Sequence, residues 1–166
     1  IARWIGTDEP QSTLLLSPPG YGKTTLLREW VRYFSDRGFT AAIADERSEI
    51  AALADGVPQL AVGRCTDVME GCSKWQAAVM LLKTMSPDLL ALDEITAPED
   101  AKAVSLCTHC GTAVIACAHA AGLDDLRQRP IYRELLALGA FHQAVIIEKQ
   151  DGQRVYRMER WEETKC

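Results

Sequence analysis

A short glycine-containing segment has the residue types and the spacing needed to bind phosphate. Residues 14–27 read LLLSPPGYGKTTLL, an apolar run followed by a tight loop and the start of a helical pattern. Gly20 and Gly22 allow positive φ values and a close backbone approach, so the N–H groups of the loop can point inward at an anion. Lys23 would place a charge on the outer phosphates and Thr24 would ligate Mg²⁺. The segment therefore predicts a nucleotide site.

The motif departs from the usual G-x-x-x-x-G-K-[ST] pattern at its first position, where Ser17 replaces glycine. A small residue at the end of a strand satisfies this position. Pro18 and Pro19 have no N–H group, so the phosphate cradle must come from the residues after them. The other reading is a chance glycine turn before a helix. The predicted nucleotide-binding residues are Ser17, Pro18, Pro19, Gly20, Tyr21, Gly22, Lys23, Thr24 and Thr25.

Two acids predict the second half of the site. The apolar residues 89–92 lead into Asp93 and Glu94, about seventy residues after the loop. Parallel strands deliver their carboxyl ends to a ligand crevice, so both carboxylates should face the nucleotide. Asp93 would hold Mg²⁺, mostly through water, because magnesium loses its water reluctantly. Glu94 would orient and deprotonate the attacking water.

A histidine is expected between these two halves. The apolar strand 113–118 ends in His119. In ATPases that place a catalytic glutamate beside the magnesium aspartate, such a strand inserts between the loop strand and the acidic strand. We therefore expect His119 near the γ-phosphate as a sensor; the alternative is a solvated loop histidine.

Charged residues at two further places are candidates for phosphate chemistry. Asp45, Glu46 and Arg47 end a buried strand at the same sheet edge. One of these acids, Glu46 or its neighbour, would supplement the catalytic glutamate, and Arg47 would reach a phosphate. Arg64, in an irregular segment, is a second candidate for charge stabilisation. For each arginine the alternative is a surface salt bridge.

The elements that must position these residues alternate along the chain, which predicts a mainly parallel sheet with helices on both faces. Asp151-Gly152 predicts a tight turn, and hence an antiparallel hairpin at one edge. Residues 47–64 should be irregular, with at most short helical pieces. The expected strands are 12–17, 39–45, 88–93, 113–118, 144–148 and 154–160, and the expected helices 24–36, 74–85, 97–111, 123–127 and 131–138.

Length and composition narrow the class of protein. The chain has 166 residues and a net charge of −5, which fits one domain and argues against a broad nucleic-acid or anionic-membrane footprint. It does not begin with Met and resembles an excised domain. Its six cysteines are irregularly spaced, which favours reduced thiols over a disulfide framework. The pair Cys107 and Cys110, with His109 between them, has no second CxxC to complete a zinc site.

Several blocks, in order, resemble the stage III sporulation protein AA family of endospore-forming bacteria. They are SPPGYGKTTLLREW, DERSEI, GRCTDVMEGC, MSPDLLALDEI and ACAHA, followed by DDLRQRP. This family is similar to the type II and type IV secretion and pilus ATPases, which work as hexameric rings. The resemblance implies a P-loop NTPase with a three-layer α/β/α sandwich and a RecA/AAA-like sheet. It places Lys23 and Thr24 in the first nucleotide motif and Asp93 with Glu94 in the second.

The resemblance also implies an acidic box at residues 45–47 and a histidine box at His119. Tyr21 stands where family members usually have a smaller residue, and Ala120 where glycine is more usual. The family carries an N-terminal region before the ATPase domain that this sequence lacks. We therefore expect one ATPase domain over residues 1–166, from a longer protein.

For function, the resemblance implies an ATPase that uses ATP and Mg²⁺ to energise a channel between mother cell and forespore. It would be cytoplasmic, on the mother-cell side, and reach the membrane through channel proteins. It would assemble as a homo-oligomer. A nucleic-acid partner is not expected, because the chain is acidic and lacks a stripe of aromatic and basic residues. ATP is favoured over GTP because the chain contains no asparagine and so lacks the guanine-reading Asn-Lys-x-Asp motif. The alternatives are a nucleotide-dependent switch and a nucleic-acid-dependent ATPase.

Overall fold

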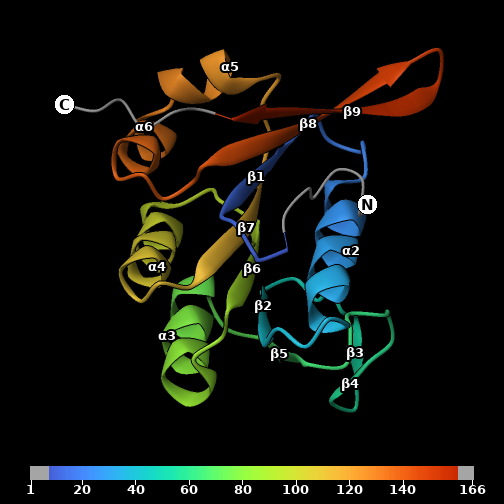
Figure 1. Ribbon diagram of the computed structural model, residues 1–166, viewed down its shortest axis with the longest axis vertical. Helices are drawn as coiled ribbons and strands as arrows, with labels where there is room; N and C mark the ends of the chain where they lie inside the picture. The colour runs from blue at the N-terminus through green and yellow to red at the C-terminus, as the bar shows by residue number, and fades with distance from the viewer. Residues whose placement is uncertain (1–7, 161–166) are drawn as a thin grey trace.

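A seven-stranded sheet forms the centre of the computed structural model, which describes residues 8–160. The strand order is β5-β2-β6-β7-β1-β8-β9, and every pairing is parallel except that of β8 with β9 (Figure 1). The strands are β1 (Thr13–Leu16), β2 (Ala41–Asp45), β5 (Thr66–Glu70), β6 (Leu89–Glu94), β7 (Ala113–Ala118), β8 (Gln143–Gln150) and β9 (Gln153–Arg160).

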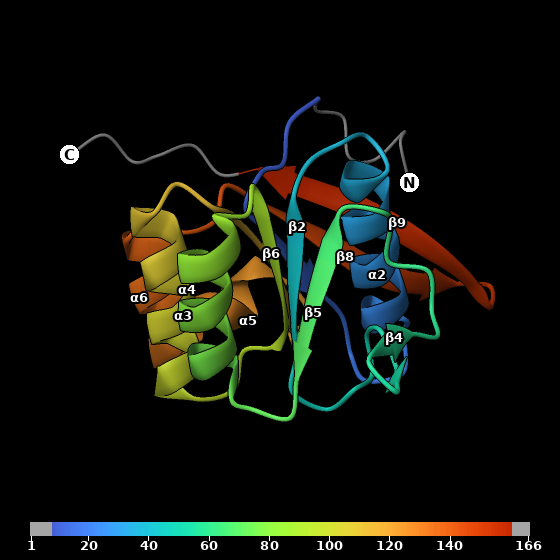
Figure 2. The same cartoon turned by 90° about the horizontal axis from the view of Figure 1, so that it is seen from below.

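Helices cover both faces of this sheet. Figure 2 shows α2 (Lys23–Ser35) on one side and α3 (Lys74–Met85), α4 (Pro98–His109) and α6 (Pro130–Ala137) on the other. A short helix, α5 (Leu123–Gln128), precedes α6. The arrangement confirms the predicted α/β class, with a mainly parallel sheet and a C-terminal antiparallel hairpin. None of the helices within residues 8–160 has the length and apolar character that a membrane crossing needs.

The central strands are apolar on both faces, as strands sandwiched between helices must be. In β1, Leu14 and Leu16 pack into the core under α3, α4 and α6, while Leu15 packs into the core under α2. Residues 89–92 of β6 divide in the same way, and all of these side chains are fully buried. The alternation means that a one-residue slip would exchange the two cores, so the register is strongly specified.

Strand β7 lies between β1 and β6, as the sequence predicted. Its residue Ala118 pairs with Leu16 at the end of β1, and its residue Cys117 pairs with Glu94 at the end of β6. The carboxyl ends of the three strands therefore lie side by side at one edge of the sheet. Whatever follows each strand is delivered to the same place.

Two features of the region after β2 differ from the sequence expectation. Residues 47–64 contain no helix; they include a small antiparallel hairpin of β3 (Leu53–Ala54) and β4 (Val57–Pro58). Residues 66–70 form the edge strand β5, which the sequence analysis did not predict. The reason is that an edge strand is half exposed, so only Val68 and Met69 pack against a core cluster and no apolar run marks the strand.

A prediction concerns the packing of the chain entering β5 against α2. Gly63 has φ 99°, and a Cβ placed there would overlap the side chain of Ser35, whose hydroxyl accepts the Cys65 N–H at 2.8 Å. Gly63→Ala should lower the free energy of unfolding by about 3 kcal/mol, from backbone strain and overpacking together. The measurement is the denaturant unfolding midpoint.

Gly38→Ala is the matched control. Gly38 has a similar φ of 95°, but a Cβ there meets nothing within 4 Å. Only the strain applies, so the loss should be about 1 kcal/mol. Equal losses for the two variants would contradict the proposed contact with Ser35.

Candidate functional site

The predicted phosphate loop, residues 17–24, runs from the end of β1 into the start of α2. Gly20 and Gly22 have φ values of 77° and 90°, in the left-handed region where glycine meets no Cβ penalty. Gly22 is the N-cap of α2 and makes no side-chain capping bond. The first N–H groups of α2 therefore have no side-chain partner from the cap and can receive an anion.

Lys23 turns back over this loop. Its Nζ donates to the carbonyl oxygens of Ser17 at 3.0 Å and Pro18 at 3.2 Å, and lies 2.8 Å from Nδ1 of His119. The residue is only 8% exposed. Burial lowers the pKa of Lys23 from its ordinary value, although nearby acids such as Glu94 act in the opposite direction.

A bulge at the end of β6 brings two consecutive acids into one cleft. Leu92 pairs with Ala116 and Glu94 with Cys117, so Asp93 is an extra residue in the ladder. Successive side chains of a regular strand point to opposite faces, and a bulge re-aims them. As a result Asp93, which is buried, and Glu94, which is half-buried, both line the cleft beside the phosphate loop.

His119 connects the two halves of the site. Its Nε2 lies 2.9 Å from Oε2 of Glu94, while its Nδ1 faces the Lys23 ammonium. A neutral imidazole protonated on Nε2 satisfies both contacts, because it donates to the carboxylate and accepts from the ammonium. Lysine, histidine and glutamate thus form a continuous polar chain.

These groups line a polar cleft of about 400 Å³ at the carboxyl edge of the sheet. The predicted residues it brings together are Pro19, Gly20, Gly22, Lys23, Thr24, Thr25, Arg47, Asp93, Glu94 and His119. Thr24 and Asp93 offer a hydroxyl and a carboxylate, the hard oxygen ligands that suit Mg²⁺. Within residues 8–160 no cluster of three His, Cys, Asp or Glu could hold a metal.

Comparison with known proteins identifies the family. A model of the family described as "Sporulation stage III, protein AA" matches residues 1–158. The chain belongs to the stage III sporulation protein AA family. It is 36% identical over 146 residues to stage III sporulation protein AA of Bacillus subtilis strain 168, which covers 85% of this chain and 48% of that protein.

Two further proteins are also similar to this sporulation-family chain. It is 31% identical over 132 residues to the ycf45 protein of Porphyra purpurea, covering 78% of the chain and 23% of that protein. It is 30% identical over 128 residues to SEEDLING PLASTID DEVELOPMENT 1 of Arabidopsis thaliana, covering 75% and 19%. The chain therefore spans about half, or less, of the length of these relatives.

Solved structures of secretion and pilus ATPases share the fold. The pilus retraction motor PilT, solved with bound ADP, superposes with a TM-score of 0.69 at 15% identity, over 94% of this chain and 49% of that one. VirB11 from the Brucella suis type IV secretion system gives 0.65 at 16% identity, over 91% and 48%. The Legionella pneumophila ATPase DotB gives 0.64 at 15% identity, over 92% and 45%. The family member thus has a secretion-ATPase fold.

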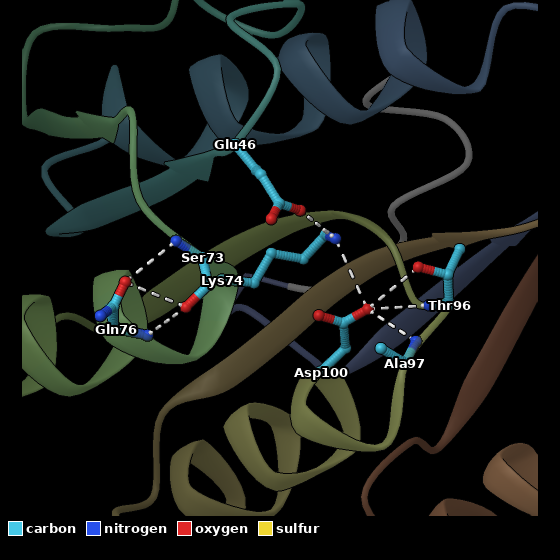
Figure 3. Close-up of polar contacts among 7 residues, drawn as sticks. All are labelled: Glu46, Ser73, Lys74, Gln76, Thr96, Ala97 and Asp100. Carbon is cyan, nitrogen blue, oxygen red and sulfur yellow. Dashed lines mark hydrogen bonds and ion pairs between the residues drawn. The ribbon is translucent and has the colours of Figure 1, made fainter.

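Glu46 is not among the residues that line the cleft. It pairs instead with Lys74 at the start of α3, whose Nζ lies 2.7 Å from Oε2 of Glu46 and 3.5 Å from Oδ2 of Asp100 (Figure 3). The same Asp100 oxygen accepts the N–H groups of Thr96 and Ala97 and so caps α4. The network joins the loop after β2 to the starts of α3 and α4.

Some of the other predicted residues also lie outside the cleft. The Ser17 hydroxyl donates to the carbonyl of Pro18 at 2.8 Å and points within the loop. The ring of Tyr21 packs against Lys149, whose Nζ lies 4.6 Å from the ring centre. Arg64 is exposed and reaches the Asp36 carbonyl at 3.5 Å. Of the two arginines considered for phosphate, the structure brings Arg47 to the cleft.

Three further residues line the cleft that sequence reasoning did not single out: Glu49, Cys117 and Arg154. Glu49 follows the acidic box, and Cys117 is the penultimate residue of β7. Arg154 comes from β9, 130 residues after Thr24, and only the hairpin geometry places it here. The tight turn Asp151-Gly152 was the available signal, since it fixes which β9 residues oppose which β8 residues.

The cysteines of residues 8–160 are free thiols. Cys107 is buried and Cys110 exposed, and burial raises the pKa of the Cys107 thiol to about 12. Cys166 lies outside the described residues. Cys107 therefore has the character of a core thiol.

Asp45 faces inward, and its carboxylate is fully occupied by backbone. It is completely buried and accepts the N–H groups of Glu49, Ile50 and Ala51 at distances between 2.8 and 3.2 Å. Its role is to fold the loop that carries Arg47. Asp45→Ala would leave these N–H groups without a partner and should cost about 3 kcal/mol of unfolding free energy.

The measurement is chemical denaturation, with Asp67→Ala as the control. Asp67 lies on the neighbouring strand β5 and is exposed, so its removal should change stability by less than about 0.5 kcal/mol. If Asp45→Ala were equally neutral, the carboxylate would not be holding the loop.

Proposed function

We propose that this chain is a single Mg²⁺-dependent ATPase domain that binds and hydrolyses ATP. The observation that carries the proposal is the convergence of Lys23, Thr24, Asp93, Glu94 and His119 on one polar cleft. Asp93 and Glu94 end β6, and His119 directly follows β7. Lys23 and Thr24 begin α2, after the loop that follows β1. The fold shared with PilT, solved with bound ADP, supports the same assignment.

In this proposal the residues of the cleft have separate tasks. Backbone N–H groups at the start of α2 and the Lys23 ammonium bind the phosphates. Thr24 and Asp93 would hold Mg²⁺, which supplies charge neutralisation on the phosphate oxygens. Glu94 accepts the proton of the attacking water, and its half-buried position leaves it reachable by that water.

The polar chain through His119 couples phosphate binding to the base. The Lys23 ammonium donates to the carbonyl oxygens of Ser17 and Pro18 and to Nδ1 of His119, which uses its three N–H groups. A phosphate oxygen that recruits the ammonium must replace some of these contacts. When Lys23 leaves Nδ1 of His119, the hydrogen bond between Nε2 and Glu94 on the other side of the ring changes in strength. Binding of the outer phosphate therefore affects Glu94, the group that activates water.

At the level of the cell, the proposal is a secretion-type ATPase in the mother cell that powers assembly of, or transport through, the channel to the forespore. Family membership and the secretion-ATPase fold support this role. The full-length protein would form a homo-oligomeric ring, such as a hexamer, that docks on membrane channel proteins. Arg47 is exposed at the mouth of the cleft, where it can reach phosphate in its own subunit or a neighbouring one.

Glu94→Gln tests the assignment of the base. The amide keeps the shape of the side chain but cannot take a proton, so ATP binding should persist while turnover falls by about 100-fold or more. Binding is measured by calorimetry and turnover by phosphate release. Glu99→Gln, an exposed position at the start of α4, is the control and should leave both unchanged. Retained turnover in Glu94→Gln would move the base to another group.

Steady-state ATPase activity over a wide range of protein concentration tests the ring. Specific activity should rise with concentration, because residues supplied by a neighbour complete the site only in the assembly. A flat, measurable rate would place every catalytic group in one chain and would contradict the need for a ring. Clear ATP binding without turnover at any concentration would favour the alternative function, a nucleotide-dependent switch.

A further inference from the structure

A second cavity, of about 210 Å³, adjoins the phosphate cleft. Both are lined by Gly22, Thr25 and Arg154, so the two spaces meet at the first turn of α2. The second one continues between α2 and the β8–β9 hairpin. Its other walls are mainly apolar and aromatic, and include Trp30 and Tyr156.

One face of the hairpin lies over the phosphate loop. Lys149 and Arg154 are directly opposed in the ladder, and paired residues of antiparallel strands share a face. Lys149 contacts the ring of Tyr21, and a Cβ on Gly22 would lie 2.9 Å from Cζ of Arg154. Tyr156, two residues further along β9, is on the same face.

Within residues 8–160, the side chain of Arg154 has no hydrogen-bond or ion-pair partner. Among residues 8–160, each arginine other than Arg47, Arg133 and Arg154 has a hydrogen bond or an ion pair to another group. Two of these three, Arg47 and Arg154, line the phosphate cleft. Cations that a protein leaves unpaired beside an anion site are available to the anion.

We propose that the cavity between α2 and the hairpin is the base subsite of the nucleotide whose phosphates occupy the cleft. Tyr156 stacks on the base, and Arg154 binds where base, ribose and first phosphate meet. The proposal rests on the ATP-binding function proposed above. It assigns the hairpin a direct part in binding nucleotide, beyond closing the edge of the sheet.

The chemistry of the walls matches a base better than a further phosphate. Leu26, Val145 and Trp30 present apolar surface, which an anion avoids and a flat heteroaromatic ring prefers. Glu29 supplies an acceptor at the same cavity. The hydrogen bond from Arg32 lowers the pKa of Glu29, so this carboxylate is ionised and can accept from an exocyclic amine of the base.

The test compares ATP with inorganic tripolyphosphate, which has the phosphate chain but no base, by titration calorimetry in the presence of Mg²⁺. The protein should bind ATP more tightly than tripolyphosphate. Tyr156→Leu should weaken ATP binding by about 10-fold, the loss expected for one base–aromatic stack, and leave tripolyphosphate unchanged. Tyr156→Phe keeps the ring and should bind ATP like the parent protein.

Arg154→Ala should also weaken ATP binding by about 10-fold. Arg157→Ala is its matched control, because Arg157 lies on the opposite face of the same strand and pairs with Glu148 and Glu159. It should leave ATP binding unchanged. Thermal unfolding of each variant reports that the hairpin is still folded.

The outcomes separate the two proposals. The base subsite would be overturned if Tyr156→Leu and Arg154→Ala left ATP affinity unchanged, or if the parent protein bound ATP no more tightly than tripolyphosphate. Either result would leave the phosphate site standing. A parent protein that binds neither ligand would overturn the ATPase assignment, and the base subsite with it.

Discussion

The position of β7 between β1 and β6 is the constraint on which the site depends. It separates the phosphate loop, after β1, from the acids at the end of β6 by two strand spacings, about 9.5 Å. Lysine and glutamate need a third group to connect them across that gap. The residue after β7 is the one placed to do so, and His119 contacts both Lys23 and Glu94. Parallel pairing of all three strands therefore also sets the distances between Lys23, His119 and Glu94.

The bulge in β6 solves a second geometric problem. The proposed magnesium binding and water activation would need two carboxylates in one cleft, but adjacent residues of a regular strand point to opposite faces. The extra residue at Asp93 lets both acids serve the same side. The strand up to Leu92 remains regular and fully buried, so the irregularity is confined to the two acids that line the cleft. Bulges of this kind concentrate next to functional sites for the same reason.

The sequence predicts best those elements that are determined by interactions between residues close together in the chain. The range of α3 was predicted to the residue, because its apolar residues recur at helical spacing and Ser86-Pro87 ends the helix. In the structure a capping box of Ser73 and Gln76 also fixes its start. The range of β7 was equally clear, since a run of six small or apolar residues between Thr112 and His119 has few other solutions. The phosphate loop depends on glycine and lysine spacing, which is also local.

The remaining elements depend on contacts between distant parts of the chain. Edge strand β5 is held by its pairing with β2. Residues 66–70 have no apolar pattern that would predict this pairing. Glu46 looked free to act on nucleotide because its partner Lys74 lies 28 residues away.

The hairpin makes the same point about function. The sequence of the hairpin predicts only an edge ribbon. The register set by the turn at Asp151-Gly152, however, places Arg154 and Tyr156 beside α2. A nucleotide bound between them would join the first helix to the last strand. Within residues 8–160, β9 pairs with β8 alone, so such a ligand would stabilise this edge of the sheet. Nucleotide binding and the order of this edge would then be linked, since any ligand that binds the folded hairpin stabilises it.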